Sequence, residues 1–296
     1  MTDEAAPKAR FSDYLELTKP RLSLLSVLTA LVGYFAARPH LGAAHALFLA
    51  LGTSLAAGGV AALNQWSESD TDARMQRTAQ RPIPSGKIAG GSAYVLGWAM
   101  CFVALIIMFT QVGRLAALFT LLTIASYLGW YTPAKRSSRW STEIGAIAGA
   151  FPPLIGWSAA EGSVSALGWI LFGILFFWQI PHFMAIAWTY RRDYSAVHFP
   201  MLPVRDEAGG KVAGWSFAAT LCLVAVSLLP PLLGFSGACY AWVAGALGAW
   251  FLWRAALFMR KDGRDGAARR LFHVSLAYLP LLLGSLVADR LLTVHP

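Results

Sequence analysis

Three oxygen-bearing side chains stand four residues apart where an apolar stretch gives way to a polar loop: Asn64, Glu68 and Asp72. If one helix continues through them, this spacing places them along one stripe of its surface, with Asp70 pointing elsewhere. Oxygen ligands suit a hard cation such as Mg²⁺, which proteins usually hold jointly with substrate phosphates. Arg77 and Arg81 follow, also four apart, and their guanidinium groups could clamp phosphate oxygens. The pattern predicts a site for Mg²⁺ and a phosphorylated substrate.

A simpler interpretation of this segment stays open. The acidic residues and Arg74 could form ordinary charge pairs on a solvated helix end, without any ligand. Asn64 weighs against that interpretation, because a polar amide on the apolar side of the stripe needs a partner.

A second polar cluster follows another apolar stretch, at Tyr190-Arg191-Arg192-Asp193-Tyr194. Asp193 could supply a carboxylate that faces the first cluster across a central cavity. The alternative is that the Arg-Arg-Asp group anchors a helix end to lipid headgroups.

The elements that must position these clusters are membrane-spanning helices. Hydrophobic residues make up 57% of the 296 residues and charged residues only 13%, whereas soluble domains carry about 25% charged residues. A helix needs roughly 20 apolar residues to cross a bilayer. Nine stretches approach that length, which predicts an all-α polytopic membrane protein with nine transmembrane helices: 22–37, 41–66, 88–113, 115–133, 144–160, 163–190, 212–234, 240–253 and 271–288.

The basic residues predict the orientation. All of the 24 Lys and Arg residues except Arg38, Arg114 and Arg290 fall in the N-terminal tail or in the loops 67–87, 134–143, 191–211 and 254–270. Because Lys and Arg accumulate on the cytoplasmic side, we expect a multi-pass protein of the bacterial inner membrane with a cytoplasmic N-terminus and a periplasmic C-terminus. The predicted division is a cytoplasmic tail at 1–21, a single transmembrane domain at 22–288 and a short periplasmic tail at 289–296.

Several other classes of protein fit poorly. The net charge of +9 comes from short basic clusters between apolar stretches, without interleaved aromatic residues on one face, so nucleic-acid binding is not indicated. Cys101, Cys222 and Cys239 are odd in number and lack C-x-x-C spacing, which predicts neither disulfides nor a zinc site. A transporter also places charged residues around a central site, but here they cluster toward one face and no halves repeat.

Further motifs occur in a fixed order along the chain. Beside N-x-x-x-E-x-x-x-D at 64–72 and RTAQRP at 77–82, they are TKPR at 18–21, YTPAKR at 131–136, GAFPPLIGW at 149–157, WQIPHF at 178–183, DY at 193–194 and PMLP at 200–203. Together these motifs resemble the heme O synthase branch of the UbiA-type intramembrane prenyltransferases. The resemblance covers residues 18 to about 203 by motif, and the rest of the chain by hydropathy and span count.

The resemblance implies a nine-helix bundle around a central cavity open toward the cytoplasmic side. It also implies transfer of a farnesyl group from farnesyl diphosphate to a vinyl group of heme B, with addition of water, giving heme O and pyrophosphate. By position, the implied ligands of Mg²⁺ are Asn64, Glu68, Asp72 and Asp193, with Glu68 and Asp72 also catalytic. The implied diphosphate contacts are Asn64, Arg77, Arg81, Tyr131, Lys135, Arg136 and Asp193. Implied partners are the two substrates, the lipid bilayer and, as a candidate, a heme A synthase or terminal oxidase assembly.

His182 follows Pro181 inside an apolar stretch, where an imidazole needs a partner. Within the resemblance it is expected to bind heme, as an axial ligand of the iron or as the acceptor of a proton from the attacking water. The alternative is a hydrogen bond to the carbonyl that Pro181 frees. For four other histidines we expect neither partners nor a role: His40, His45, His273 and His295.

The expected reaction passes through an allylic cation, which aromatic faces can stabilise. Four aromatic residues are candidates for this role, with lipid-facing packing as the alternative: Tyr127, Trp130, Tyr131 and Trp178.

The chain departs from the wider family at two positions: Glu68 replaces an Asp, and Val197 stands where the second motif would have its last Asp. It departs from the heme branch at Val197-His198, where Ala-Gly is usual. The missing acid favours the heme branch over relatives that prenylate another aromatic acceptor such as hydroxybenzoate. Three alternatives remain: a prenyltransferase that acts on another aromatic acceptor, a membrane transporter and a scaffold for oxidase assembly.

Overall fold

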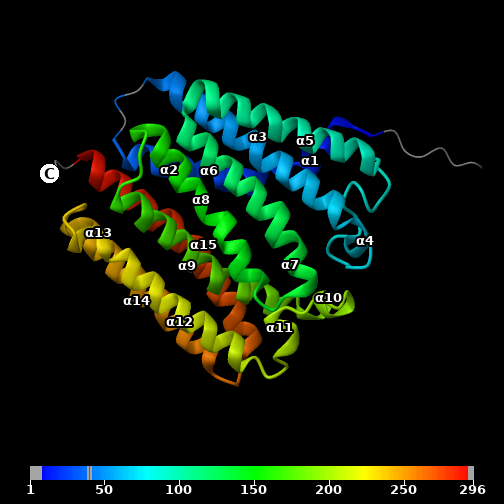
Figure 1. Cartoon of the computed structure of the whole chain (residues 1–296). Coiled ribbons are helices and arrows are strands. Elements are labelled where there is room, and N and C mark those ends of the chain that lie inside the picture. Colours follow the sequence, from blue (N-terminus) through cyan, green and yellow to red (C-terminus); the bar gives the residue numbers. More distant parts are fainter. Residues whose placement is uncertain (1–8, 39, 41, 293–296) are drawn as a thin grey trace, which may run out of the picture.

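A computed structural model describes residues 9–38, 40 and 42–292, and every regular element in this part of the chain is helical (Figure 1). The long helices are α2 (Pro20–Ala36), α3 (Ala43–Ser67), α5 (Gly90–Ile107), α6 (Arg114–Ala125), α8 (Ser141–Glu161), α9 (Ala166–Thr189), α12 (Gly210–Ser227), α14 (Ala238–Met259) and α15 (Arg264–Leu292). The short ones are α1 (Phe11–Leu17), α4 (Ser69–Asp72), α7 (Thr132–Ser137), α10 (Arg191–Ala196), α11 (Leu202–Arg205) and α13 (Leu229–Leu232). Two π-helical segments, η1 (Met108–Val112) and η2 (Ser126–Tyr131), extend α5 and α6. The all-α prediction is confirmed.

Seven helical segments of the described chain are long and apolar enough to cross a bilayer. They are Ala43–Ser67, Gly90–Val112, Arg114–Ser137, Ala166–Thr189, Gly210–Leu232, Ala238–Met259 and Arg264–Leu292. The other two predicted spans correspond to α2, which is apolar but has 17 residues, and to α8, which is rich in small residues and contains Pro152 and Pro153. The chain is therefore a multi-pass membrane protein.

The sequence placed the ends of the last two spans wrongly. Helix α14 continues to Met259 instead of ending at residue 253, and α15 begins at Arg264, so most of the predicted loop 254–270 is helical. Arg264 explains the late turn between them. Its buried guanidinium donates hydrogen bonds to the carbonyls of Phe258 and Met259 and to that of Ala208, satisfying the free end of α14.

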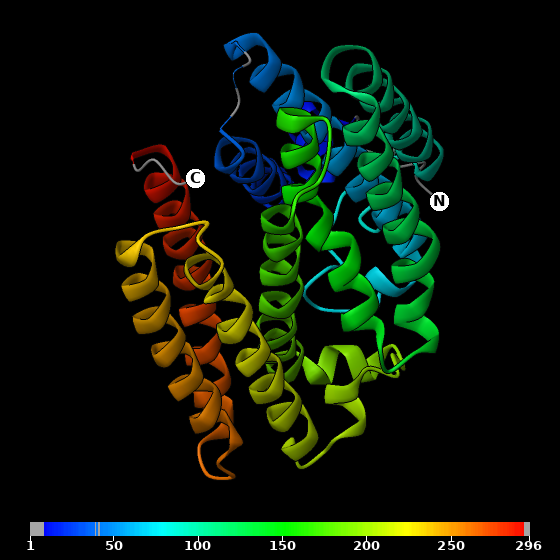
Figure 2. The same ribbon diagram turned by 60° about the vertical axis from the view of Figure 1, so that its left-hand side comes forward.

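Helix α8 lies at the centre of the bundle, in contact with α2, α6 and α9. Helix α9 in turn packs against α12 and α15, so the later helices form a second group beside the first (Figure 2). The short helices α4, α7, α10 and α11 gather at one end of the bundle, whereas α13 and the end of α15 lie at the other (Figure 1). The predicted chemistry-bearing loops thus share one end.

Helices α2 and α8 meet without side chains between their backbones. A Cβ atom at Gly156 would lie 1.7 Å from the carbonyl oxygen of Ala30, and one at Gly33 would lie 2.1 Å from that of Pro153. Small residues allow such close approach between membrane helices. The two helices are therefore fixed against each other at the end remote from the polar loops.

We expect Gly156→Ala to destabilise the fold by about 1–3 kcal/mol, because the added methyl group overlaps backbone that cannot move aside freely. Thermal unfolding in detergent should shift down by roughly 2–10 °C. Gly245→Ala is the matched control, since a Cβ atom there meets nothing within 4 Å. Equal shifts for the two variants would contradict the assigned role of the α2–α8 contact.

Candidate active site

The chain bearing the three predicted oxygen ligands bends at Glu68. Helix α3 ends there, with φ −103° and ψ 8°, and α4 carries the chain on to Asp72. The Glu68 N–H still donates to the Asn64 carbonyl (3.0 Å) and the Asp72 N–H to the Glu68 carbonyl (2.8 Å), so the one-turn spacing survives. The exposed fractions of Asn64, Glu68 and Asp72 are 1%, 4% and 0%, whereas Asp70 is exposed. A solvated helix end is therefore not what the structure contains.

A cation from a different segment meets each of these three side chains. The Lys135 ammonium of α7 donates to both carboxylate oxygens of Glu68, at 2.8 and 3.1 Å. Arg81 donates to Asp72 Oδ2 at 2.6 Å, and Lys19 approaches Asn64 Oδ1 at 3.4 Å. Buried carboxylates are strongly destabilising without such partners. The site is thus a compact cluster in which basic groups outnumber acidic ones.

The electrostatics of the cluster are visible in two pKa shifts. Burial acts to raise the pKa of Glu68, but the charges of Lys135 and Lys19 and the hydrogen bonds from Lys135 and Asn64 outweigh it, so the pKa is lowered and the carboxylate stays ionised. The pKa of Lys19 is lowered to about 7, first by burial and then by repulsion from Arg81 and Lys135. The charge of Lys19 therefore changes near neutral pH.

Lys19 has an unusual backbone conformation at the turn between α1 and α2. This residue is left-handed, with φ 48° and ψ 62°, and Pro20 starts α2 directly after it. Left-handed geometry is unfavourable for a side-chain-bearing residue and often occurs at functional sites. The turn between α1 and α2 is anchored by Gln65, whose amide donates to the Leu17 carbonyl at 2.7 Å.

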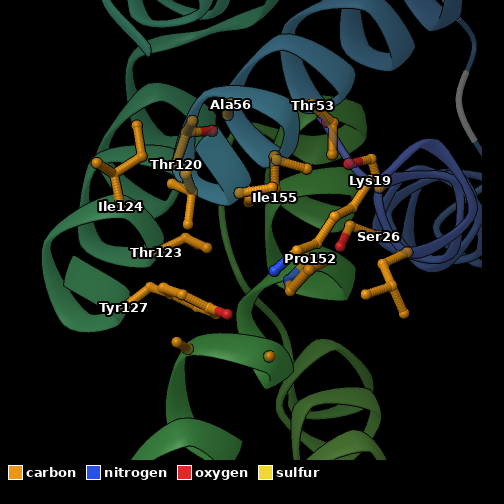
Figure 3. Close-up of a pocket in the computed structure, with 17 residues that line it drawn as sticks. Lys19, Ser26, Thr53, Ala56, Thr120, Thr123, Ile124, Tyr127, Pro152 and Ile155 are labelled. Carbon is orange, nitrogen blue, oxygen red and sulfur yellow. The ribbon is translucent and has the colours of Figure 1, made fainter. Parts of the chain in front are cut away.

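A cavity of about 150 Å³ opens beside the cluster, between α2, α3, α6, η2 and α8. Lys19 and Tyr127 reach into it from opposite sides (Figure 3). Its lining runs along α3 from Ala61 to Thr53, which is about two turns or ~12 Å, and consists mostly of small and apolar side chains. The cavity can hold an apolar chain whose charged end meets the cluster.

The oxygen donors fit a hard cation. Asp72 Oδ1 is buried and has no hydrogen-bond partner among the described residues, so one carboxylate oxygen is available. No three His, Cys, Asp or Glu side chains of the described chain come close enough together to hold a metal ion. A cation here would accordingly rely on Glu68, Asp72 and Asn64 together with oxygens of a substrate.

The second polar cluster packs against the first loop through apolar contacts. Val197 is buried with Met75 and Phe199, so the position of the family's last acid is part of a small hydrophobic core. Arg77 does not meet the carboxylates: it donates to the Tyr194 hydroxyl at 3.2 Å and lies over the Tyr190 ring at 5.3 Å. Asp193 lies in α10 and is half-buried.

Several predicted residues point in different directions. Arg136 pairs with the exposed Asp70 at 2.6 Å, outside the buried cluster, and lowers the pKa of that carboxyl. Tyr131 lies 4.6 Å from the Lys135 ammonium and packs edge-on against Tyr127. Trp130 is 65% exposed on the outside of the bundle, as its lipid-facing alternative predicted. Trp178 is buried and stacks on His182 instead of lining the cavity.

The histidines correct two expectations. The partner of His182 is the hydroxyl of Ser275, at 2.7 Å from Nδ1, and not the carbonyl that Pro181 frees. His45, expected to lack partners, approaches the Tyr34 hydroxyl at 3.3 Å and the Val112 carbonyl at 3.0 Å, at the end of η1. His40 and His273 are exposed, His198 is exposed with φ 57°, and His295 lies outside the described residues.

Comparison with known proteins identifies the family. The model of the UbiA prenyltransferase family matches residues 26–276, which is most of the chain. The chain belongs to this family. Membership makes it an enzyme. It also confirms the resemblance to this family that the sequence motifs indicated. A protoheme IX farnesyltransferase of Opitutus terrae is 67% identical to this chain. The match covers 99% of this chain and 100% of that relative. One of Solibacter usitatus is 41% identical over 94% and 98%.

Solved structures of other proteins share the fold. A digeranylgeranylglyceryl phosphate synthase superposes with a TM-score of 0.81 at 16% identity, covering 95% of this chain and 99% of that one. A UbiA homolog from Archaeoglobus fulgidus bound to GPP and Mg²⁺ gives 0.63 at 14% identity, covering 93% and 99%. At these identities the likeness extends to the fold alone.

Sequence reasoning did not assign a role to three residues that complete the geometry: Lys19, Thr132 and Ser275. Lys19 was visible as a lysine before proline at the start of an apolar stretch, within the TKPR motif. Thr132 accepts a long contact from the Asn64 amide (3.5 Å) and gave no separate signal. Ser275 lies 93 residues from His182, and only folding brings the two together.

We expect this UbiA enzyme to bind inorganic pyrophosphate more weakly as the pH rises above about 7, because Lys19 then loses its charge. With one linked proton, the affinity should fall by up to about tenfold per pH unit. Calorimetric titration without Mg²⁺, in buffers of different ionisation enthalpy, should detect proton uptake on binding near pH 7.5. Lys19→Arg keeps the charge and should abolish this uptake. Equal uptake by both proteins would show that another group titrates.

Proposed function

We propose that this chain transfers a farnesyl group from farnesyl diphosphate to a vinyl group of heme B, with addition of water, giving heme O and pyrophosphate. The 67% identical relative, matched over its whole length, has the name of that activity. The structural observation that carries the proposal is the buried Asn64, Glu68 and Asp72 stripe, paired with three cations at the mouth of an apolar cavity.

The basic groups of the cluster would bind the diphosphate. Mg²⁺, held by Asn64, Glu68 and Asp72 with substrate oxygens, would supply a Lewis acid that polarises the leaving diphosphate. Lys135 and Arg81 neutralise the two acids in the structure, and Lys19 is not paired with a carboxylate of the described residues. When a diphosphate binds, these three cations are placed to stabilise the negative charge that develops on the leaving group. Asp193, Arg77, Arg136 and Tyr131 remain proposed contacts, reached if the loops close over the substrate.

The cavity would protect the allylic cation from water. Its walls along α3 and α8 are mostly apolar, and Tyr127 presents its ring beside the cluster. Tyr131 packs against Tyr127 and under Lys135, which places two aromatic rings near the expected leaving group. Ring faces stabilise a desolvated cation by about 2 kcal/mol or more. The farnesyl chain would extend along the cavity away from the charges.

His182 would act on the heme substrate, as the ligand of the iron or as the acceptor of the proton from water. It lies in α9 with its ring between Trp178 and Phe272, in apolar surroundings that suit a porphyrin. His182 does not line the cavity into which Lys19 reaches, so the two substrates would approach from different sides.

We also propose nine transmembrane helices, with α2 and α8 as the two beyond the seven clear spans. The tails at 1–21 and 289–296 would then lie on the cytoplasmic and periplasmic sides of the bacterial inner membrane, flanking one domain at 22–288. The gathering of α4, α7, α10 and α11 at one end supports a cavity open to the cytoplasm (Figure 1). A heme A synthase or terminal oxidase assembly is the proposed consumer of the product.

Glu68→Gln and Asp72→Asn test the proposal, because each removes one buried negative charge with little change in shape. We expect each to lower heme O formation by roughly 10²–10³-fold, measured with purified protein, heme B, farnesyl diphosphate and Mg²⁺. Asp70→Asn is the matched control: it lies in the same segment but is exposed and paired with Arg136. Its activity should stay within about twofold of wild type.

Three outcomes would count against the proposal. Equal activity of all three variants would remove the stripe from the reaction. Consumption of farnesyl diphosphate with unaltered heme would keep the prenyltransferase and replace the acceptor with another aromatic compound. If neither substrate changes in the wild-type protein, the transporter and scaffold alternatives return.

A further inference from the structure

The hydrogen bonds around Ser275 determine which nitrogen of His182 carries its proton. The Ser275 hydroxyl lies 2.6 Å from the carbonyl oxygen of Phe272, which can only accept. The hydroxyl has one hydrogen, and at this distance it must be donated to that carbonyl. The same oxygen lies 2.7 Å from His182 Nδ1, so it can only accept there. His182 therefore carries its proton on Nδ1.

The other ring nitrogen is left with a free lone pair. No residue of the described chain forms a hydrogen bond with His182 Nε2, and this atom is not among the fully enclosed polar atoms without partners. The side chain is 8% exposed, so the ring is largely but not completely enclosed. Nε2 is thus the ring nitrogen left to accept a proton or to bind a metal ion.

The ring is also held in place from its faces. Trp178 stacks on it at 4.7 Å with an interplanar angle of 22°, and Phe272 lies 5.1 Å away. The Trp178 indole in turn donates to the Ser275 carbonyl at 2.8 Å. Ser275, fully buried on α15, therefore binds both the imidazole through its side chain and its stacking partner through its backbone.

We infer that Ser275 is a positioning residue, which fixes His182 in the Nδ1–H form and makes Nε2 the nitrogen that meets the heme substrate. A hydrogen bond from one imidazole nitrogen commonly orients the other toward a metal or a reacting proton. The heme part of this inference rests on the proposed function, whereas the protonation state of the ring does not.

The first experiment measures the protonation of the ring without any substrate. Protein labelled with ¹⁵N-histidine is studied by NMR in detergent, and the His182 signals are assigned by their loss in His182→Ala. Wild type should show a protonated Nδ1 and an unprotonated Nε2, and Ser275→Thr should retain this pattern. Ser275→Ala should give a mixture of the two forms. A protonated Nε2 in wild type, or an unchanged pattern in Ser275→Ala, would overturn the inference.

The matched control is Ser285→Ala. Ser285 lies on the same helix and donates in the same way to a carbonyl three residues back, that of Leu282, but no imidazole meets it. This variant should leave the His182 signals unchanged. A change equal to that of Ser275→Ala would show a general effect of losing a helical hydroxyl.

The second experiment measures heme O formation and heme binding by the same variants. Ser275→Ala should lower turnover by about 10–100-fold and weaken the optical signature of imidazole-bound heme, while Ser275→Thr and Ser285→Ala should keep both. Wild-type turnover in Ser275→Ala would refute the positioning role even if the proton is on Nδ1. If wild type makes no heme O, the proposed function and the heme part of the inference fail, but the NMR result still decides the protonation of His182.

Discussion

The structure depends on two carboxylates that are removed from water at the edge of a membrane. Such carboxylates need positively charged partners. Glu68 and Asp72 are almost fully buried, and an unpaired ionised carboxylate there would be strongly unfavourable. Their partners come from α7 and from the loop after α4, and Lys19, from the segment before α2, contacts Asn64 beside them. The cluster therefore joins three segments that are distant in the sequence, and holds them around one end of the cavity.

The cavity itself follows from the way α2 and α8 cross. The two helices touch backbone to backbone around Gly33 and Gly156, whereas nearer the cluster their residues line an open space. Contact at one end and separation at the other leave a space between the two helices, and Lys19 of the cluster lines it. The small residues and prolines of α8 serve this geometry, which explains why it is less apolar than a lipid-facing span.

The second loop is held to the first by apolar and aromatic contacts instead of a further acid. Val197 packs with Met75 and Phe199, and Arg77 bridges to Tyr190 and Tyr194. An aspartate in place of Val197 would put a charge into this small core. In the second loop, as far as the structure describes the chain, these contacts take the place of a further acid, and Arg77 links this loop to the first.

By itself, the sequence determined the composition-driven features: a membrane protein, all-helical, with its polar loops grouped by charge and its oxygen ligands one turn apart. These depend on hydropathy and on neighbours within one helical turn, which are written locally in the chain. The family could also be recognised from short motifs. The ends of helices were less predictable. The end of α14, for example, depends on Arg264, whose guanidinium donates hydrogen bonds to the carbonyls of Phe258 and Met259.

Only the tertiary structure decided which charges meet. Lys135 and Arg136 are adjacent, yet one enters the buried cluster and the other pairs with exposed Asp70, since successive helical side chains point about 100° apart. The pairs Lys19–Asn64, Lys135–Glu68 and His182–Ser275 are separated by 45, 67 and 93 residues. No local pattern encodes such contacts, because they arise from how whole helices pack and from where their backbones can approach.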